Sequence, residues 1–551
     1  MSDATTATTK TSWLPLIIVV LTQIQASFAV NALTVSMAGI TGDLSIAATS
    51  VGTAITASTF AMAAFILLGA KIGSRFGSKG VFQIAAAGHG LAMLAVALAP
   101  TGSVLFIAQA ASGVFIALIS PALTVFIATN YRGRQQGVAI GLLAAAIPAA
   151  GVLALLIAGT FATTIGWRWS FLLVVALAVV NLALSLALKK IPAQALLQID
   201  WTGAIIAAIS IILLSFGFSG LEPWGVVMAS EGAPFDILGL SPAPLLVILG
   251  LVGGQIFFVW VARRLKEKKS RIFDLRVLRS SSELMITACM GIMLFIGTAA
   301  NFVIPLYMQV VQGRTGIETS FAIIPYTLSI FLASTFIASL YGRFRPRHIA
   351  TGGFVVVAAA LTLLAFSIQN SWGQAAIVAG LILLGLGQGS IVALVFNTLL
   401  SRAPKELAGD VGAWRGLVHN LSGSVGIAVI SVFAVSVLSG LVISKVDESP
   451  ILTPEVVAEV NLDNVNFVTN EQLEGVLAET GASADEVDEA VRINEEARLR
   501  ALQISLLGLA ALALLALVPA TRMPDKGMDE LPEKLEPDDP DAIEVPEEVE
   551  A

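Results

Sequence analysis

The stretch "GAKIGSRFGSKG", residues 69–80, separates two long apolar runs and carries Lys71, Arg75 and Lys79 but no acid. Each flanking run has about 20 residues, the length that a helix needs to cross a bilayer. Short loops rich in lysine and arginine favour the cytoplasmic side of a membrane. Glycines such as Gly77 allow a tight turn and close packing of helix ends. We therefore interpret this stretch as a cytoplasmic turn between two membrane-spanning helices.

The composition of the whole chain indicates the same class. Of the 551 residues, 56% are hydrophobic and only 13% are charged, whereas soluble proteins contain about 25% charged residues. The one cysteine, Cys289, excludes an internal disulfide and a multi-cysteine metal site. The 3 histidines are far apart, so we expect no metal centre and no cofactor.

The net charge of −7 is unevenly distributed. Residues 444–500 hold 14 acids and 4 bases, and residues 525–550 hold 12 acids and 2 bases. The rest of the chain has 12 acids and 25 bases, so the part that enters the membrane is basic. The proline- and acid-rich composition of the C-terminal segment predicts a disordered tail.

Fourteen long apolar runs predict an all-α membrane protein with 14 transmembrane helices. They are too long and too continuous for barrel strands, which have about 10 residues of alternating pattern. The runs lie near 13–37, 51–70, 80–99, 104–128, 136–160, 169–188, 203–220, 244–262, 284–307, 317–340, 349–368, 374–399, 413–440 and 501–520.

The placement of the bases predicts the orientation. With a cytoplasmic N-terminus, most lysines and arginines fall in loops on the cytoplasmic side, including eight from Arg263 to Arg279. The short loops of the other side hold only Arg168 and Arg314. We therefore expect both termini in the cytoplasm and the segment 444–500 outside.

The outer segment 444–500 shows three helix-start patterns. Thr453 followed by Pro454 resembles an N-cap with proline at the first helical position. Thr469 with Gln472, and Ser483 with Glu486, have the spacing of capping boxes. We expect the last of these helices to continue into the final apolar run.

Deep carboxylates are absent from the apolar runs, but Asp410, Arg415 and His419 lie near the start of the thirteenth. Ionisable groups within a membrane are costly and usually functional. One interpretation is a titratable cluster that couples protons or gates the molecule. The alternative is that Arg415 snorkels to the interface, Asp410 caps the helix and His419 is a packed neutral residue.

Five motifs occur in an order and spacing that resemble a known family. They are "AKIGSRFGSKG" (70–80), "GWRWSF" (166–171), "IDWTGA" (199–204), "PLYMQVVQG" (305–313) and "AGDVGAWRGLVHNLSGSVGIA" (408–428). Together they resemble the major facilitator superfamily, and within it the 14-helix drug:proton antiporters. The resemblance implies two six-helix bundles with two helices inserted between them.

This resemblance gives the expected domain boundaries. They are a cytoplasmic N-terminus (1–12), an N-terminal bundle (13–188), a linker with two helices (189–282), a C-terminal bundle (283–520) and an acidic cytoplasmic tail (521–551).

The chain departs from the family pattern where charge is expected. Where the family has an acid in helix 1, this chain has Ala29. It has Ser74 in place of the family's acid in the loop between helices 2 and 3, and Gln109 in place of the family's arginine in helix 4. The Gly-Pro of the antiporter motif falls on Ala154 and Leu155. The scaffold matches the family better than the proton machinery does.

Amides are the main polar groups inside the runs that, by resemblance, line a central cavity. We expect them to hydrogen-bond substrate, the alternative being contacts between helices. The cavity residues expected on this basis are Gln25, Asn31, Gln109, Asn301 and Gln388.

The apolar runs predict a multi-pass membrane protein. The resemblance implies a secondary transporter of the bacterial plasma membrane that exports small amphipathic or hydrophobic molecules, with protons as the candidate coupling ion. Its partners are the substrate and the bilayer, and not nucleic acid. A transporter of lipid or cell-envelope components and a non-transporting scaffold remain as alternatives. An enzyme is disfavoured because no carboxylate pair, Cys/His pair or phosphate-binding loop is found at a water-facing edge.

Overall fold

The computed structural model describes residues 12–46, 48–221, 223–230, 232–278, 280–314, 316–340, 343–370, 375–453, 467, 470–478 and 482–523. Within these residues the structure is helical, and its β interactions are isolated bridges among Met228, Ile237 and Leu240. The disorder predicted for 525–550 and the helix starts predicted at Pro454 and Thr469 fall outside the described residues.

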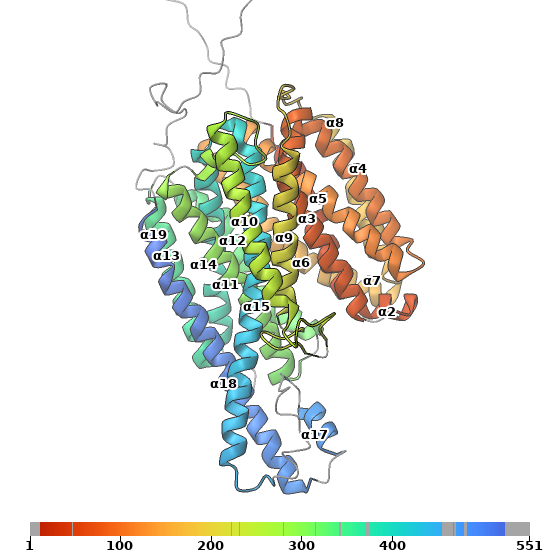
Figure 1. Ribbon diagram of the computed structural model, residues 1–551, viewed down its shortest axis with the longest axis vertical. Helices are drawn as coiled ribbons and strands as arrows, with labels where there is room; N and C mark the ends of the chain where they lie inside the picture. The colour runs from red at the N-terminus through yellow and green to blue at the C-terminus, as the bar shows by residue number, and fades with distance from the viewer. Residues whose placement is uncertain are drawn as a thin grey trace, which may run out of the picture.

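The first part of the chain forms one group of helices, red and orange in Figure 1. Its elements are α1 (Leu14–Val35), α2 (Met37–Leu44), α3 (Ala48–Phe76), α4 (Ser78–Ala97), α5 (Gly102–Asn130), α6 (Gly133–Leu153), the π-helix η1 (Ala154–Ala158), α7 (Gly159–Thr164) and α8 (Arg168–Leu186). In this N-terminal half, α1 packs on α6 and α8, and α5 packs on α3 and α4. The α3–α5 contact requires glycine, because a Cβ at Gly69 would lie 2.3 Å from the carbonyl oxygen of Ala117.

The last part of the chain forms a second group, green to blue in Figure 1. Its elements are α11 (Ser281–Leu306), the π-helix η3 (Tyr307–Val311), α12 (Gly316–Phe336), η4 (Ile337–Leu340), α13 (Pro346–Ser367), α14 (Ala375–Arg402), η5 (Lys405–Leu407), α15 (Ala408–Glu448), α17 (Asn470–Ala478), α18 (Ala484–Leu515) and α19 (Leu517–Thr521). In this C-terminal half, α14 packs on α11, α12 and α13, and α18 packs on α11, α13 and α15.

Two helices connect the halves. α9 (Trp201–Gly220) and α10 (Pro242–Lys266) pack along each other, and η2 (Leu275–Leu278) follows them. α9 contacts both α3 and α15, so α9 and α10 cover the interface between the two halves, as Figure 1 shows. We call this interface the seam.

The predicted all-α membrane fold is confirmed. All fourteen apolar runs lie on helices, and thirteen helices among the described residues are long and apolar enough to cross a membrane. The remaining run is α12, whose apolar part, Phe321–Phe336, is shorter.

Two helices extend well beyond membrane length. α15 has 41 residues and α18 has 32, whereas about 20 suffice to span a bilayer. Their extended ends pair at the bottom of Figure 1, around a small core of Leu438, Ala497 and Ala501. The predicted capping box of Ser483 and Glu486 is present, and α18 continues into the final apolar run as expected.

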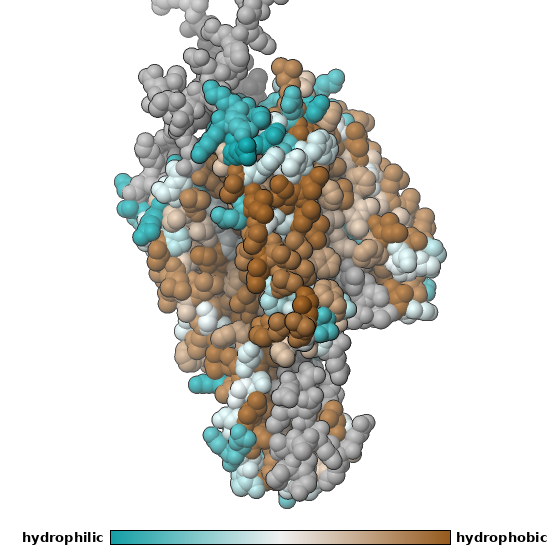
Figure 2. Space-filling view, in the orientation of Figure 1, coloured by the Kyte–Doolittle hydropathy of each residue, from teal (hydrophilic) through white to brown (hydrophobic). Residues whose placement is uncertain are grey.

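The two ends of the molecule differ in polarity. We call the end that carries the turn 69–80 and the segment 263–279 the basic end. Figure 2 shows hydrophilic atoms at this end, above a broad hydrophobic belt over α9 and α10. The extended ends of α15 and α18 lie at the opposite end.

Candidate functional site

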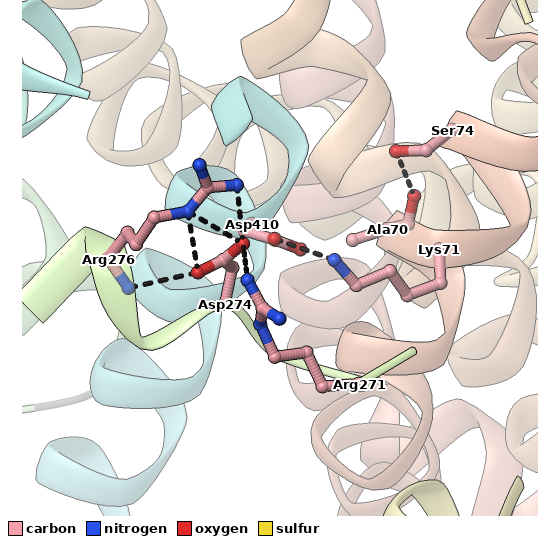
Figure 3. Close-up of polar contacts among 7 residues, drawn as sticks. All are labelled: Ala70, Lys71, Ser74, Arg271, Asp274, Arg276 and Asp410. Carbon is pink, nitrogen blue, oxygen red and sulfur yellow. Dashed lines mark hydrogen bonds and ion pairs between the residues drawn. The ribbon is translucent and has the colours of Figure 1, made fainter. Parts of the chain in front are cut away.

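A buried ion pair joins the two halves at the basic end. The Nζ of Lys71 on α3 donates to Oδ2 of Asp410 on α15 over 2.7 Å, and both side chains are buried (Figure 3). The two residues are 339 positions apart in the chain. The pair therefore holds α3 of one half against α15 of the other.

The linker segment after α10 lies against this pair. Asp274 accepts from Arg271 and Arg276, each over 2.8 Å, and its backbone N–H donates to the Asp410 carboxylate. Burial alone would raise the pKa of Asp274, but the hydrogen bonds and the charges of the two arginines lower it to about 2. Asp274 is thus a stable anion that fixes the linker at the basic end (Figure 3).

Further contacts close the seam at the same end. The Nε2 of Gln136 on α6 donates to Oγ of Ser401 on α14 over 3.2 Å. A Cβ at Gly141 would lie 2.0 Å from the carbonyl oxygen of Ser334, so α6 and α12 are in backbone contact. The halves are therefore tightly packed at the basic end.

The structure does not bring Asp410 to Arg415, which one of the two interpretations of the sequence placed in a single cluster with His419. Asp410 and Arg415 are five residues apart on α15, which turns them about 140° from each other around the helix. Asp410 consequently faces Lys71, whereas Arg415 and His419 share the face that lines a cavity. The sequence did not reveal Lys71 as the partner of Asp410.

The other residues of the 69–80 motif shape the turn. Gly77 has φ +91°, a conformation that favours glycine, and lies between α3 and α4. The Nζ of Lys79 donates to the carbonyl oxygens of Leu186 and Leu188 at the end of α8. Arg75 stacks over the ring of Phe76.

Two further motifs supply polar contacts between helices. In "GWRWSF", Trp167 Nε1 donates to Asp43 over 3.0 Å and Arg168 forms an ion pair with the same carboxylate. In "IDWTGA", Asp200 caps α9 and accepts from Trp260 Nε1 over 3.0 Å, which ties α9 to α10.

A central cavity with two lobes lies between the halves. One lobe, of about 480 Å³, is lined by α1, α6, α11, α12, α14 and α15. The other, of about 520 Å³, is lined mainly by α1, α3, α5 and α15. Both lobes are bordered by Asn31, Ile147, Thr298, Arg415 and His419. Among the described residues, no cluster of three or more metal-ligating side chains occurs.

Three of the five expected amides line the first lobe, namely Asn31, Asn301 and Gln388. The hydroxyl of Tyr326 donates to Oε1 of Gln388 and so fixes that amide in the wall. Tyr326 was not singled out from the sequence. The chain has only 4 tyrosines, and one within an apolar run needs a partner for its hydroxyl, which is the signal that could have identified it.

Gln25 and Gln109 are not among the residues that line either lobe. Gln25 contacts His89 Nδ1 over 2.8 Å and accepts from Asn181 over 2.7 Å, in a buried network between α1, α4 and α8. Gln109 is buried within the N-terminal half on α5. The structure places both amides in helix packing and away from the cavity.

Arg415 is in an unusual position for a membrane-embedded cation. It borders both lobes, and its guanidinium lies 4.8 Å from the centre of the Phe396 ring. His419 is one helical turn further along the same wall. No aspartate or glutamate is among the described residues that line either lobe.

Two helical halves that enclose a central cavity form the arrangement typical of a membrane transporter. The chain belongs to the Major Facilitator Superfamily, whose family model matches residues 19–427. It is an integral membrane protein, and members of this family carry small molecules across membranes.

Several sequence relatives have names that describe resistance or export. The puromycin resistance protein pur8 of Streptomyces alboniger is 26% identical over 76% of this chain and 81% of its own. The tetracenomycin C resistance and export protein of Streptomyces glaucescens is 23% identical, over 68% and 67% respectively. The uncharacterized MFS-type transporter EfpA of Mycobacterium tuberculosis is 24% identical over 72% of each chain.

Solved structures share the fold. The human organic anion transporter MFSD10 superposes with a TM-score of 0.56 at 9% identity, covering 92% of this chain and 99% of its own. The proton:xylose symporter XylE superposes with a TM-score of 0.55 at 12% identity, covering 94% and 98%.

Proposed function

We propose that the chain exports small amphipathic or hydrophobic molecules across the bacterial cell membrane by alternating access. The observation that carries this proposal is the central cavity between two halves that are packed together at the basic end. The exposed area of its wall is mostly apolar, with amides and hydroxyls interspersed and with Arg415 and His419 between the lobes, which suits a ligand with a large apolar body. The relatives named for puromycin and tetracenomycin C resistance support efflux, and they do not favour the envelope-component or scaffold alternatives.

The basic end faces the cytoplasm in this proposal, with both termini on that side, because lysine and arginine accumulate in cytoplasmic loops. The closed seam then seals the cytoplasmic side. Residues 13–188 and 283–520 rock against each other, and the linker 189–282 spans the seam between them. Residues 444–500 lie outside the cell, and 521–551 lie in the cytoplasm.

Protons are the proposed coupling ion, and Asp410 is the proposed site. Protonation of Asp410 removes the charge that holds Lys71, so proton binding weakens the contact between α3 and α15. Among the described residues, Asp274, Arg271 and Arg276 are further charged groups beside this pair, and Glu406 interacts with Arg276.

The test is uptake into inverted vesicles of three pyrene amphiphiles that differ only in head-group charge: 1-pyrenebutyrate, its neutral amide and the trimethylammonium analogue. We expect at least one probe to accumulate when a pH gradient is imposed. Asp410→Asn should abolish gradient-driven uptake while substrate exchange continues. Failure of all three probes to accumulate contradicts export, and full gradient-driven uptake by Asp410→Asn contradicts the assignment of the proton site.

A further inference from the structure

The cavity wall contains one permanently charged side chain among its described residues, and it is positive. Arg415 borders both lobes, and the nearest ionisable member of the wall, His419, can only add positive charge. The wall has no described carboxylate that could neutralise either residue. The cavity wall, as far as the structure describes it, therefore carries a positive charge with no neutralising carboxylate beside it.

Several other buried ionised groups among the described residues have a partner of opposite charge. Lys71 pairs with Asp410 over 2.7 Å, and Arg402 pairs with Glu283 over 2.6 Å. Arg415 instead faces the ring of Phe396, 4.8 Å away. A cation–π contact recovers only part of the cost of holding an arginine away from water, so the guanidinium remains available to an anion.

The position of Arg415 also distinguishes a binding group from a snorkelling one. A snorkelling side chain carries its charge to the membrane surface. Arg415 borders the cavity and lies on the cavity side of the Lys71–Asp410 ion pair, further from the basic end. Arg415 comes five positions after Asp410, which is about 7.5 Å along a helix axis. The guanidinium therefore lies near the closed floor of the cavity.

The surroundings of Arg415 fit an amphipathic ligand. Met290, Leu294, Val392 and Phe396 give the first lobe an apolar wall. A planar guanidinium can donate two parallel hydrogen bonds to a carboxylate, sulfonate or phosphate. A ligand with an acidic head group and an apolar body would satisfy both features at once.

We propose that the transported molecules are amphipathic anions and that Arg415 binds their acidic head group at the floor of the cavity. This inference rests on the proposed transport function and specifies its substrate class. Arg415 is a specificity-determining residue, and the apolar lobe accommodates the body of the ligand.

The test measures binding of the same three pyrene probes to the purified full-length chain in phosphatidylcholine nanodiscs, with empty nanodiscs as background. The anion, 1-pyrenebutyrate, should bind roughly tenfold more tightly than the neutral amide, since hydrogen bonds to charged groups are among the stronger ones. The trimethylammonium probe should bind most weakly. Arg415→Gln should remove the preference for the anion and change the Kd of the amide less than twofold.

Two variants complete the design. Arg415→Lys keeps the charge but loses the bidentate geometry, so it should retain part of the preference. Arg263→Gln removes an exposed arginine at the end of α10, and it should bind all three probes like the parent. Equal or tighter binding of the amide or the cation by the parent, or no binding of any probe, overturns the inference. An equal loss for all three probes in Arg415→Gln also overturns it.

Comparing probe binding in nanodiscs with probe uptake into vesicles distinguishes failure of the anion-site proposal from failure of the export proposal. If the anion binds preferentially but no probe accumulates in vesicles, the anion site stands and export fails. If the cation or the amide is the probe that accumulates, export stands and the anion inference fails.

Discussion

Among single residues, we expect substitutions in the Lys71–Asp410 pair to lower stability the most. Asp410→Asn leaves the Lys71 ammonium buried without its partner, and removing one member of a buried pair costs about 3–5 kcal/mol. We expect a clear fall in the melting temperature of the purified protein. The double variant Lys71→Met/Asp410→Met should recover most of that loss, because well-packed apolar residues often replace a buried pair without cost.

The control for this comparison is Arg263→Gln. Arg263 pairs with the exposed Glu267, and this pair lies outside the seam. An unchanged melting temperature in Asp410→Asn would mean that the pair does not hold the halves together.

The Asp274 carboxyl should make the stability of the protein depend on pH. The pKa of Asp274 is lowered from 3.8 to about 2 in the folded protein. A depressed carboxyl pKa contributes stability above the unfolded pKa, and this contribution is lost as the pH falls toward the folded value. The shift corresponds to about 2 kcal/mol.

We therefore expect Asp274→Asn to lower the melting temperature at pH 7 and to differ less from the parent at pH 3. Thermal unfolding between pH 7 and pH 3 measures this difference. A constant difference across that range would contradict the role given to the Asp274 charge.

The surroundings of single side chains were harder to predict from the sequence than the helices were. Asn31 lines the cavity, whereas Gln25 on the same helix faces α4 and α8. In a helix that is apolar on all sides, the periodicity that separates a buried face from an exposed one is missing. The partner of Asp410 was equally hidden, because Lys71 is 339 residues away and no local pattern connects them.

At the scale of elements, the sequence was far more informative. The length of each apolar run predicted a helix, and Ser483 with Glu486 predicted the start of α18. The π-helices η1 and η3 were not anticipated, because a one-residue change of hydrogen-bond register leaves little trace in composition. The extension of α15 to Glu448 was missed for a related reason, since its polar end lies beyond the apolar run.

The start of α18 gives the prediction at this scale. Ser483→Ala removes a capping side chain, which typically costs about 1 kcal/mol. We expect faster amide hydrogen exchange in the first turns of α18 and no change in the membrane-spanning part. Asp488→Ala, an exposed change on the same helix, should leave exchange at the capped end unaltered. Equal exchange rates in Ser483→Ala and the parent would show that the cap is dispensable.

At the scale of the whole molecule, the orientation of the chain can be tested with exposed positions at the two ends. In a Cys289→Ser background, a cysteine replacing Lys190 after α8 should react with an impermeant maleimide only from the cytoplasm. A cysteine replacing Asp485 at the start of α18 should react only from outside. Both side chains are exposed, so accessibility reports sidedness. Labelling in the reverse pattern would invert the proposed topology.

Alternating access requires the seam at the basic end to open during each transport cycle. Gln136 and Ser401 face each other across it, with their side chains 3.2 Å apart. We propose to replace both with cysteine in the Cys289→Ser background and to measure uptake of the pyrene probes into inverted vesicles before and after oxidation. Each single-cysteine variant serves as a control. The disulfide should stop transport, and a reductant should restore it. Undiminished transport with the disulfide fully formed would contradict alternating access through this seam.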